Sequence, residues 1–406
     1  MNGSSPSVLV VTMAFPAPSE AFAGVEVRAL RKLGVKVRVA ALRFRHRMND
    51  ELLRDWRLGD VVVTHWSKHT ILRACGFLVR HPRMVAETVG WLVRHGWRRP
   101  ATLSRGILLL PRSFEIFADC LRRPPEVLHL FWGHYTATIA HMALRWMPGI
   151  HVSTALGAYD LLLDYGPGLD VARSAHSVWT QAECNREPLS RAGVRADRLR
   201  VVVRGIDAAQ VGAAQVKQPD APVVVIARLE ENKGVDDALR AFAGAAEDHH
   251  GVRLVVVGEG PQEGSLRSLA ARLGIERRVD FMGAVSHSRV FELLQRAGTF
   301  LLLSRNPSER LPNALKEAMA CRCICIVTQT PGLEEISAAW SRPLVVEQGN
   351  WKAAAALLRA VLDSPGSWES DRDAGRAFVI DRLDASEVAR KRIAVWMALG
   401  GSSCAA

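Results

Sequence analysis

A short apolar run followed by a polar turn and a helical pattern constrains the fold of this 406-residue chain more than any other feature. Residues 223–226 are all β-branched and apolar, and the polar segment 228–234 follows them. Val235, Leu239 and Phe242 then recur at helical spacing. This order predicts a buried strand, a loop and a helix, the repeating unit of a parallel α/β sheet.

Similar units at both ends of the chain predict two domains. Further buried strands are expected at residues 8–12, 35–39, 127–131, 178–180 and 254–257. With 49% apolar residues, a chain of this length can bury two cores. Periodicity is lost over residues 208–221, which we predict to be a linker between domains 1–207 and 222–377. Residues 378–406 are predicted to contain a C-terminal helix.

Two cations follow the strand expected at residues 223–226. Arg228 and Lys233 would lie on its exit loop, and ligands bind at the carboxyl ends of strands in open parallel sheets. Two cations there suit a nucleoside diphosphate. Gly258 and Gly260, after the next strand, would let the backbone approach a ligand closely.

Two carboxylates, Glu309 and Glu317, are eight positions apart with Pro312 between them. If a helix begins near Pro312, Glu317 lies inside it and Glu309 lies in the preceding loop. Both could then contact one ligand at the helix N-terminus near Asn313, where unpaired N–H groups favour phosphate.

In this order, Arg228 and Lys233, Gly258-Glu259-Gly260, Phe281-Met282-Gly283 and the two glutamates resemble the C-terminal domain of the family 4 retaining glycosyltransferases of GT-B fold. The resemblance implies two doubly wound, Rossmann-like domains facing across a cleft. It also implies that the C-terminal helix crosses back to the N-terminal domain, and that domain 1–207 binds the acceptor while domain 222–377 binds the nucleotide sugar.

The same resemblance implies roles for individual residues. Arg228 and Lys233 would stabilise the donor diphosphate, Glu317 would bind the ribose, and Glu309 would face the transferred sugar. Catalysis is therefore assigned to Glu309, Arg228 and Lys233. The residues expected to bind the donor are Gly258, Gly260, Met282, Gly283, Leu311, Asn313 and Glu317.

Weaker matches in the first domain resemble glycosyltransferases of colanic-acid and exopolysaccharide biosynthesis. They are Phe15-Pro16-Ala17-Pro18-Ser19-Glu20-Ala21-Phe22 and His129-Leu130-Phe131-Trp132-Gly133-His134. The resemblance implies a saccharide acceptor, with a polyprenyl-diphosphate-linked form as one candidate, in exopolysaccharide, capsule or lipopolysaccharide synthesis. The residues assigned to the acceptor are Ser19, Glu20, His134 and Asp160.

Three residues depart from the family pattern. Gly157 stands where the subgroup has a histidine, and Arg310 and Arg322 stand where the family has glycine. His134 could supply an imidazole from a neighbouring strand end. Arg310 could read an acidic sugar or block the donor. Three alternatives therefore stay open: a non-catalytic paralogue that binds nucleotide, a sugar-nucleotide epimerase of the same fold, and a basic nucleic-acid module.

No metal or cofactor is predicted beyond the nucleotide-sugar substrate. There is no Asp-x-Asp motif in a suitable loop, and the cluster Cys321, Cys323 and Cys325 has no paired Cys or His motif to complete a metal site. In a strand, these thiols would lie on one buried face. Metal-independent transfer is expected.

The net charge of +12 is concentrated in residues 73–105, where seven arginines accompany Glu87 alone among acidic residues. Trp91 and Trp97 are interleaved with them. This pattern predicts contact with an anionic membrane surface. The sequence has no RNA- or DNA-binding motif, no apolar stretch of membrane-spanning length and no signal peptide. We expect a cytoplasmic protein, peripheral on the inner leaflet of the inner membrane.

Overall fold

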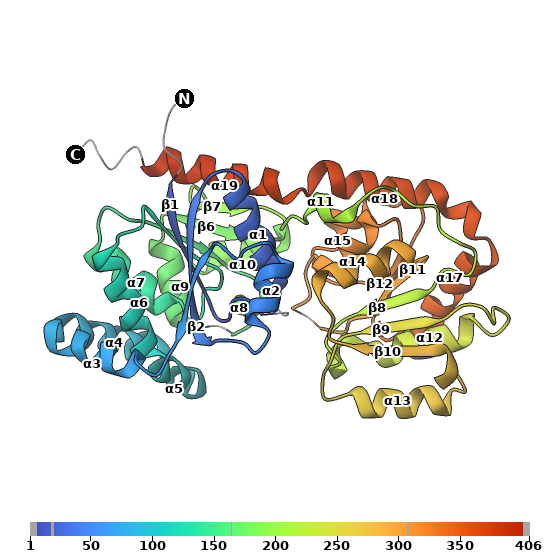
Figure 1. Ribbon diagram of the computed structural model, residues 1–406, viewed down its shortest axis with the longest axis horizontal. Coiled ribbons are helices and arrows are strands. Elements are labelled where there is room, and N and C mark those ends of the chain that lie inside the picture. The colour runs from blue at the N-terminus through green and yellow to red at the C-terminus, as the bar shows by residue number, and fades with distance from the viewer. Residues whose placement is uncertain (1–5, 18–19, 164, 307, 401–406) are drawn as a thin grey trace. The chain divides into compact units, whose positions relative to one another are not determined.

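The computed structural model describes residues 6–17, 20–163, 165–306 and 308–400. The chain divides into two compact units. Unit 1 comprises Met1–Val203 and Ser386–Ala406, and unit 2 comprises Arg204–Ala385. Each unit contains a parallel sheet with helices on its faces (Figure 1). The prediction of two α/β units with parallel sheets is confirmed.

The described residues of unit 1 form a seven-stranded sheet in the order β3-β2-β1-β4-β5-β6-β7. The winding direction reverses between β1 and β4, which are hydrogen-bonded neighbours. Such a switch point opens a crevice at the carboxyl ends of the two strands. The strands are β1 (Ser7–Thr12), β2 (Lys36–Phe44), β3 (Val62–Trp66), β4 (Val127–Leu130), β5 (His151–Ala155), β6 (Ser177–Thr180) and β7 (Leu199–Val201).

The helices of unit 1 lie between these strands in the chain, and α19 follows unit 2. Helix α1 ends just before Gly34, whose φ of 81° favours glycine at a helix C-terminus. The helices are α1 (Ala21–Lys32), α2 (Asn49–Asp55), α3 (Thr70–Arg80), α4 (Pro82–Gly96), α5 (Pro100–Leu108), α6 (Leu110–Arg122), α7 (Ala137–Trp146), α8 (Ala158–Leu163), α9 (Gly166–Ser174), α10 (Arg186–Arg191) and α19 (Ala385–Gly400).

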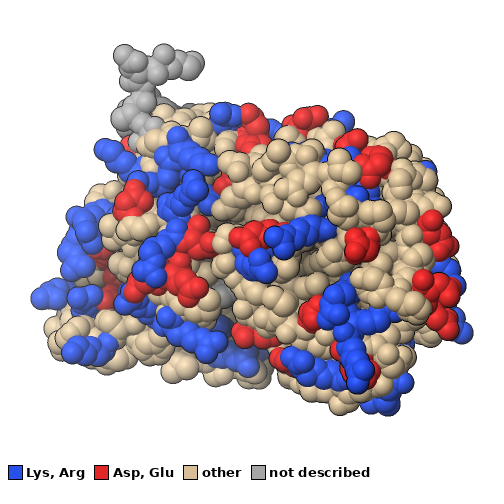
Figure 2. All heavy atoms as spheres, turned by 45° about the vertical axis from the view of Figure 1, so that its right-hand side comes forward, with Lys and Arg blue, Asp and Glu red and all other residues tan. Residues whose placement is uncertain are grey.

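Charged side chains of both signs are interspersed on the surface of the protein, as one face shows (Figure 2). Many arginines lie next to an acid close in sequence, such as Arg191 beside Glu187. Such exposed pairs contribute only about 0–1 kcal/mol each. The excess of positive charge therefore bears on partners rather than on the fold.

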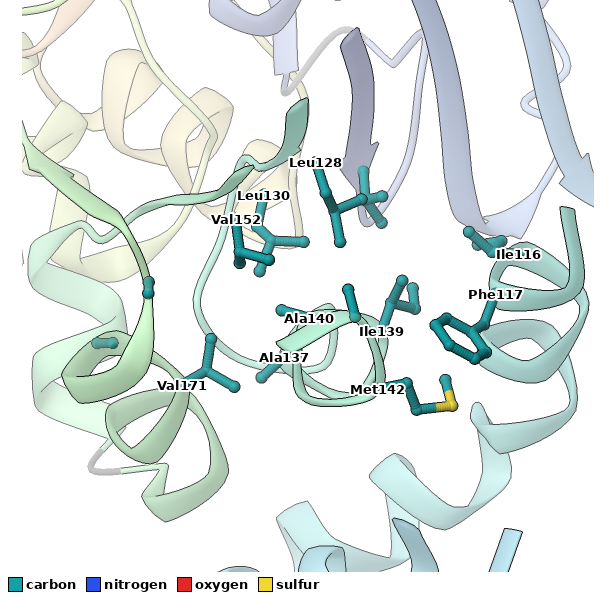
Figure 3. Packing of buried hydrophobic residues seen from close by; sticks show 14 of the residues in the cluster. Ile116, Phe117, Leu128, Leu130, Ala137, Ile139, Ala140, Met142, Val152 and Val171 are labelled. Atoms are coloured by element: carbon teal, nitrogen blue, oxygen red, sulfur yellow. The ribbon is translucent and has the colours of Figure 1, made fainter. Parts of the chain in front are cut away.

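The core of unit 1 is built where β4 and β5 meet the helices α6, α7 and α9 (Figure 3). Leu128 and Leu130 of β4 and Val152 of β5 are fully buried, as are Ile139 and Met142 of α7. Burying one such side chain contributes roughly 1.5–3 kcal/mol. This packing holds the strand ends of unit 1 in place.

Unit 2 repeats the design with a six-stranded sheet in the order β10-β9-β8-β11-β12-β13. Its switch point lies between β8 and β11. The strands are β8 (Val223–Ile226), β9 (Leu254–Val257), β10 (Val279–Gly283), β11 (Thr299–Leu302), β12 (Ile324–Thr328) and β13 (Val345–Val346). The α-helices are α11 (Ala208–Val211), α12 (Val235–Ala245), α13 (Glu263–Arg272), α14 (His287–Arg296), α15 (Asn313–Ala320), α16 (Glu334–Ser337), α17 (Trp351–Asp363) and α18 (Glu369–Arg382).

The C-terminal helix differs from the single helix expected near residues 378–399. Helix α18 ends at Arg382 in unit 2, and α19 begins at Ala385. Ile206 N donates to Leu383 O at 2.8 Å and Ala385 N donates to Ile206 O at 2.9 Å, so these residues bond across the chain instead of continuing a helix. Most of α19 then belongs to unit 1.

A buried polar network attaches α19 to unit 1. Arg392 Nη1 lies 2.9 Å from Glu26 Oε1 and 2.7 Å from His129 Nε2. Trp396 Nε1 donates to Ser153 Oγ at 3.1 Å. Because an unpaired charge would be costly in this dry site, these partners fix the position of the helix on the sheet.

Segment 208–221, expected to be a linker, lies within unit 2. It contains α11, and Lys217 Nζ donates to Leu294 O at 3.0 Å and to Gln295 O at 2.6 Å. The segment lacks helical periodicity because most of it packs as irregular chain on α14. The boundary between the units falls at Val203 and Arg204.

Candidate active site

Lys233 and Glu309 meet at the switch point of unit 2. Lys233 ends η3 (Glu231–Lys233), which follows β8, and Glu309 lies in the loop after β11. Lys233 Nζ is 2.5 Å from Glu309 Oε2, and the two side chains are only 13% and 14% exposed. The pairing of β8 with β11 therefore joins two residues that sequence analysis assigned to the same ligand.

Backbone and hydroxyl contacts hold these two loops together. Ser304 Oγ donates to Asn232 O at 3.2 Å and lies 3.3 Å from Glu309 Oε2. Arg305 N donates to Asn232 O at 2.8 Å. Glu309 is thus oriented by a hydroxyl and an ammonium before any ligand binds, which is the preorganisation that electrostatic catalysis needs.

The glycines of this edge have a different role from the one expected. A Cβ on Gly258 would lie 1.9 Å from Ala227 O, and one on Gly260 would lie 2.4 Å from Leu229 O. Both therefore allow the loop after β9 to pack on the loop after β8. Close approach of the backbone is confirmed, but in this structure the approaching group is the neighbouring loop.

Met282 and Gly283 end β10 at the same edge of the sheet. Gly258 N donates to Gly283 O at 2.9 Å, which aligns the ends of β9 and β10. The Met282 side chain is 40% exposed. An exposed apolar side chain beside aligned backbone groups suits a planar base.

Glu317 lies on α15, which begins at Asn313 directly after Pro312, as predicted. His287 Nε2 is 2.9 Å from Glu317 Oε1, and each of the two side chains is 9% exposed. Sequence reasoning missed His287, because a lone histidine outside any motif is usually structural. The available signal was Ser286, whose hydroxyl caps α14 and makes His287 the first residue of that helix after β10.

Lys316, the neighbour of Glu317, is fully buried. Its Nζ donates to Arg204 O at 2.6 Å. Burial lowers the pKa of Lys316 to about 7, and the nearby Arg204 lowers it further, whereas Glu317 raises it. Helix α15 is thereby anchored to the segment at which the chain enters unit 2.

The remaining donor residues surround this pair less closely. Arg228 is 60% exposed in its side chain and pairs with Glu230. Leu311 is buried, and Asn313 is half-buried at the start of α15. Arg310 Nη1 donates to Glu309 O at 3.1 Å. Its guanidinium therefore lies next to the loop that carries Glu309.

In unit 1, three expected acceptor residues gather around the switch point. His134 follows β4 and Asp160 follows β5, and His134 Nδ1 is 2.9 Å from Asp160 Oδ1. Glu20 follows β1, and its carboxylate accepts a hydrogen bond from the Thr12 hydroxyl and one from Ala14 N. Burial raises the pKa of Glu20, although both hydrogen bonds oppose the shift.

Asp160 also explains the backbone around Gly157. Gly133 N donates to Asp160 Oδ1 at 3.0 Å, and Gly157 N donates to Asp160 Oδ2 at 2.9 Å. The second bond resembles half of a capping box at the start of α8. Asp160 thus orients His134 while it supports the loop in which the subgroup has a histidine. Ser19, the fourth expected acceptor residue, lies outside the described residues.

Arg322, expected to bear on donor choice, has structural partners. It has a φ of 63°, a conformation that favours glycine. Its guanidinium donates to Asp373 at 2.8 Å, to Glu369 at 2.7 Å and to Gln215 O at 2.7 Å. These three contacts tie α18 to the turn after α15 and offset the backbone strain.

In the described parts of the chain, no group of three or more His, Cys, Asp or Glu side chains could hold a metal ion. Cys321, Cys323 and Cys325 are all buried. Only Cys325 lies in β12, so the expectation of three thiols on one strand face is wrong: Cys321 ends α15 and Cys323 is in the turn. Burial raises the pKa of each thiol.

Comparison with known families assigns unit 2. Residues 211–377 match the model of the glycosyl transferases group 1. The chain carries a family 4 glycosyltransferase domain. The matched range contains Arg228, Lys233, Glu309 and Glu317, the residues that converge at the switch point.

Curated relatives match part of the chain. Glycogen synthase of Mycobacterium tuberculosis is 28% identical over 56% of this chain and 55% of its own length. The putative colanic acid biosynthesis glycosyltransferase WcaL of Escherichia coli is 30% identical over 42% of this chain and 44% of its own length. The chain thus spans about half the length of these relatives.

Solved structures match nearly the whole chain. Anabaena HepE in complex with UDP and glucose has a TM-score of 0.71 at 14% identity, over 97% of this chain and 99% of that one. A sucrose-phosphate synthase from Thermosynechococcus elongatus has a TM-score of 0.69, also at 14% identity, over 98% of this chain and 100% of that one. These likenesses show that this glycosyltransferase domain belongs to a chain with the GT-B fold.

Proposed function

We propose that the protein is a retaining glycosyltransferase that moves a sugar from a nucleoside diphosphate sugar to a saccharide acceptor without a metal ion. The observation that carries this proposal is the convergence of Lys233 and Glu309 at the switch point of unit 2. Matches to glycogen synthase and WcaL support the reaction class, and the structure of HepE with UDP and glucose supports a UDP-sugar donor.

The donor site would act mainly by electrostatics. Departure of the nucleoside diphosphate places negative charge on the phosphate oxygens, and Lys233 and Arg228 would stabilise that charge. Glu309 now neutralises Lys233, so donor binding would transfer part of the ammonium's hydrogen bonding to phosphate. The Glu309 carboxylate would then face the sugar from which the diphosphate departs.

Glu317 and His287 would form the nucleoside end of the site. A carboxylate that is 9% exposed and already held by an imidazole loses little conformational freedom when it binds ribose hydroxyls. Met282, Gly283 and the aligned ends of β9 and β10 would contact the base. Leu311 and Asn313 would complete the wall at the start of α15.

On the acceptor side, His134 would take the place of the histidine that Gly157 lacks. Its ring is buried and oriented by Asp160, as a general acid or base requires. Glu20 and Ser19 would bind acceptor hydroxyls. The likeness to WcaL supports an acceptor of exopolysaccharide, capsule or lipopolysaccharide synthesis, including one linked to polyprenyl diphosphate.

A non-catalytic paralogue is the second candidate, and Gly157 favours it. Both candidates predict that nucleotide sugars stabilise the protein in a thermal-shift screen, by roughly 2.7 kcal/mol at 100 times the dissociation constant. Only the transferase gives a glycosylated product. Product analysis with the stabilising donor, alone and with saccharide acceptors, also identifies an epimerase, which needs no acceptor.

A membrane surface is the partner expected for unit 1. Helices α3, α4 and α5 expose large apolar side chains, among them Leu72 at 72%, Val79 at 76%, Trp97 at 63% and Leu108 at 72%. Arg94, Arg98 and Arg99 are exposed on the same segment. Apolar side chains among cations suit the interface of an anionic leaflet. This supports a peripheral position on the inner membrane.

In the described residues, no helix combines the length and apolarity needed to cross a bilayer. Vesicle flotation tests the surface contact directly. Replacing Arg94, Arg98 and Arg99 by glutamine should release the protein from anionic vesicles. Binding to neutral and anionic vesicles alike would contradict the proposal, and salt-sensitive binding to oligonucleotides would favour the nucleic-acid alternative.

A further inference from the structure

A cavity of about 520 Å³ opens at the β3 edge of unit 1, beside α3 and α6. Its lining includes Arg38 of β2, Thr64 of β3, Arg73 of α3, and Arg112 and Glu115 of α6. Glu20, His134 and Asp160 are not among the lining residues. The cavity is therefore distinct from the acceptor residues described above.

The lining carries an excess of positive charge. Five arginines face two carboxylates, Glu115 and Asp119, which leaves a surplus of three positive charges. Burial raises the pKa of both carboxyls, but hydrogen bonds from Arg112 and Thr70 to Glu115 and from Arg123 to Asp119 outweigh it and hold both values below normal. The two acids are ionised at neutral pH, and the surplus persists.

The carboxylates hold the guanidinium groups in place. Arg112 is 3% exposed and donates to Ala41 O at 3.0 Å, to Thr64 Oγ1 at 2.9 Å and to Glu115 Oε2 at 2.8 Å. These contacts use three of its five N–H groups. Arg73 Nη1 donates to Glu115 Oε1 at 2.7 Å. Guanidinium groups fixed in this way match the geometry of a phosphate.

An apolar groove of about 610 Å³ continues from this cavity between α3 and α6. The two share Arg73, Glu115 and Arg122. Leu72, Phe77 and Leu121 line the groove, and Gly76 leaves its floor without a side chain. A charged cavity that runs into an apolar groove suits a molecule with a phosphate at one end and a hydrocarbon chain at the other.

We propose that the two cavities bind one anionic phospholipid of the bilayer, with its phosphate in the arginine cavity and an acyl chain along the groove. This inference rests on the proposed membrane contact of α3–α5. Exposed apolar side chains of α3, Ile71, Leu72, Leu78 and Val79, flank the site and would themselves be covered by the bilayer. Charge complementarity with the phosphate and this apolar surround favour a membrane lipid as the occupant.

Dihexanoyl phosphatidic acid below its critical micelle concentration is the probe, with inorganic phosphate as the head group alone. Arg73→Gln with Arg122→Gln removes two charges from side chains that are 60% and 69% exposed, so the fold is retained. Gly76→Phe fills the groove without changing charge: a Cβ there meets only the flexible end of Arg80, at 3.2 Å. Calorimetric titration measures both probes.

We expect the double variant to bind both probes about tenfold more weakly, as loss of charged hydrogen bonds implies. Gly76→Phe should lose the lipid by a similar factor and keep inorganic phosphate. Arg191→Gln with Arg195→Gln is the matched control, because it removes two exposed, paired arginines elsewhere on unit 1. The control should bind both probes as the wild type does.

Unchanged lipid binding in both cavity variants would overturn the proposal. So would preferential binding of geranyl diphosphate together with normal vesicle binding by Gly76→Phe, because that pair of results assigns the cavities to a lipid-linked acceptor. If replacing Arg94, Arg98 and Arg99 abolishes vesicle flotation and Gly76→Phe leaves it intact, the membrane contact stands and this site falls. Donor binding in the thermal-shift screen is independent of all these outcomes.

Discussion

Nε2 of His287 lies 2.9 Å from Oε1 of Glu317, although the two residues are 30 positions apart. The contact joins the first residue of α14 to the middle of α15 and removes much of the rotational freedom of the carboxylate. A ribose ligand would therefore meet an acceptor that is already oriented.

His287→Ala should weaken nucleotide binding by about 0.5–1.5 kcal/mol, the usual net value of one hydrogen bond. His287→Gln, which restores a side-chain donor, should recover part of the loss. Isothermal titration with UDP and the other nucleoside diphosphates measures both. Equal affinity in all three proteins would show that His287 only packs between the helices.

Lys233→Ala should weaken nucleotide binding by about 1.5–3 kcal/mol, as for a hydrogen bond to a charged group. Arg228→Ala should act in the same direction but less, because its side chain is 60% exposed and water screens its charge. Arg267→Ala on α13 is a control for loss of an exposed arginine in the same unit. Unaltered affinity in both site variants would refute the diphosphate assignment.

The two glutamates should separate binding from turnover. Glu317→Ala should weaken both the free nucleotide and the full donor, because ribose is common to them. Glu309→Ala should lower kcat and spare the nucleotide, because a residue on the sugar side can lose only contacts to the sugar or the transition state. An active wild type whose Glu309→Ala variant keeps full turnover would contradict the role of Glu309.

Lys316 should make stability depend on pH. Its folded pKa of about 7 lies below the unfolded value, so between the two the unfolded chain binds more protons and stability rises with pH. Relative to Lys316→Met, the wild type should gain on the order of 1 kcal/mol per pH unit above pH 7. Urea unfolding from pH 6 to pH 9 measures the difference, which should be flat below pH 7.

Arg322 offers a test of structural against functional substitution. Arg322→Ala should destabilise unit 2 by about 1–3 kcal/mol, because three hydrogen bonds are lost. Arg322→Gly should cost about 1 kcal/mol less than alanine, because glycine relieves the strain of a φ of 63°. Denaturant unfolding ranks the variants. A change in donor preference without a change in stability would return Arg322 to the donor site.

Local chemistry was enough to predict several elements from the sequence. Pro312 cannot donate a hydrogen bond within a helix, and α15 begins at the next residue, Asn313. The β-branched run 223–226 forms β8 over those same residues, because such side chains pack well in a buried strand. The spacing of motifs was enough to indicate the family, because motif order along a chain survives when identity is low.

Only the tertiary structure decided which residues touch. Lys233 and Glu309 are 76 positions apart, and they meet because β11 pairs with β8 rather than with β10. No local preference encodes that strand order. His287 and the arginine cavity at β3 escaped prediction for the same reason: each is assembled from segments whose proximity follows from long-range packing. The sequence determined the elements and the chemistry available, and the order of strands in each sheet decided where that chemistry converges.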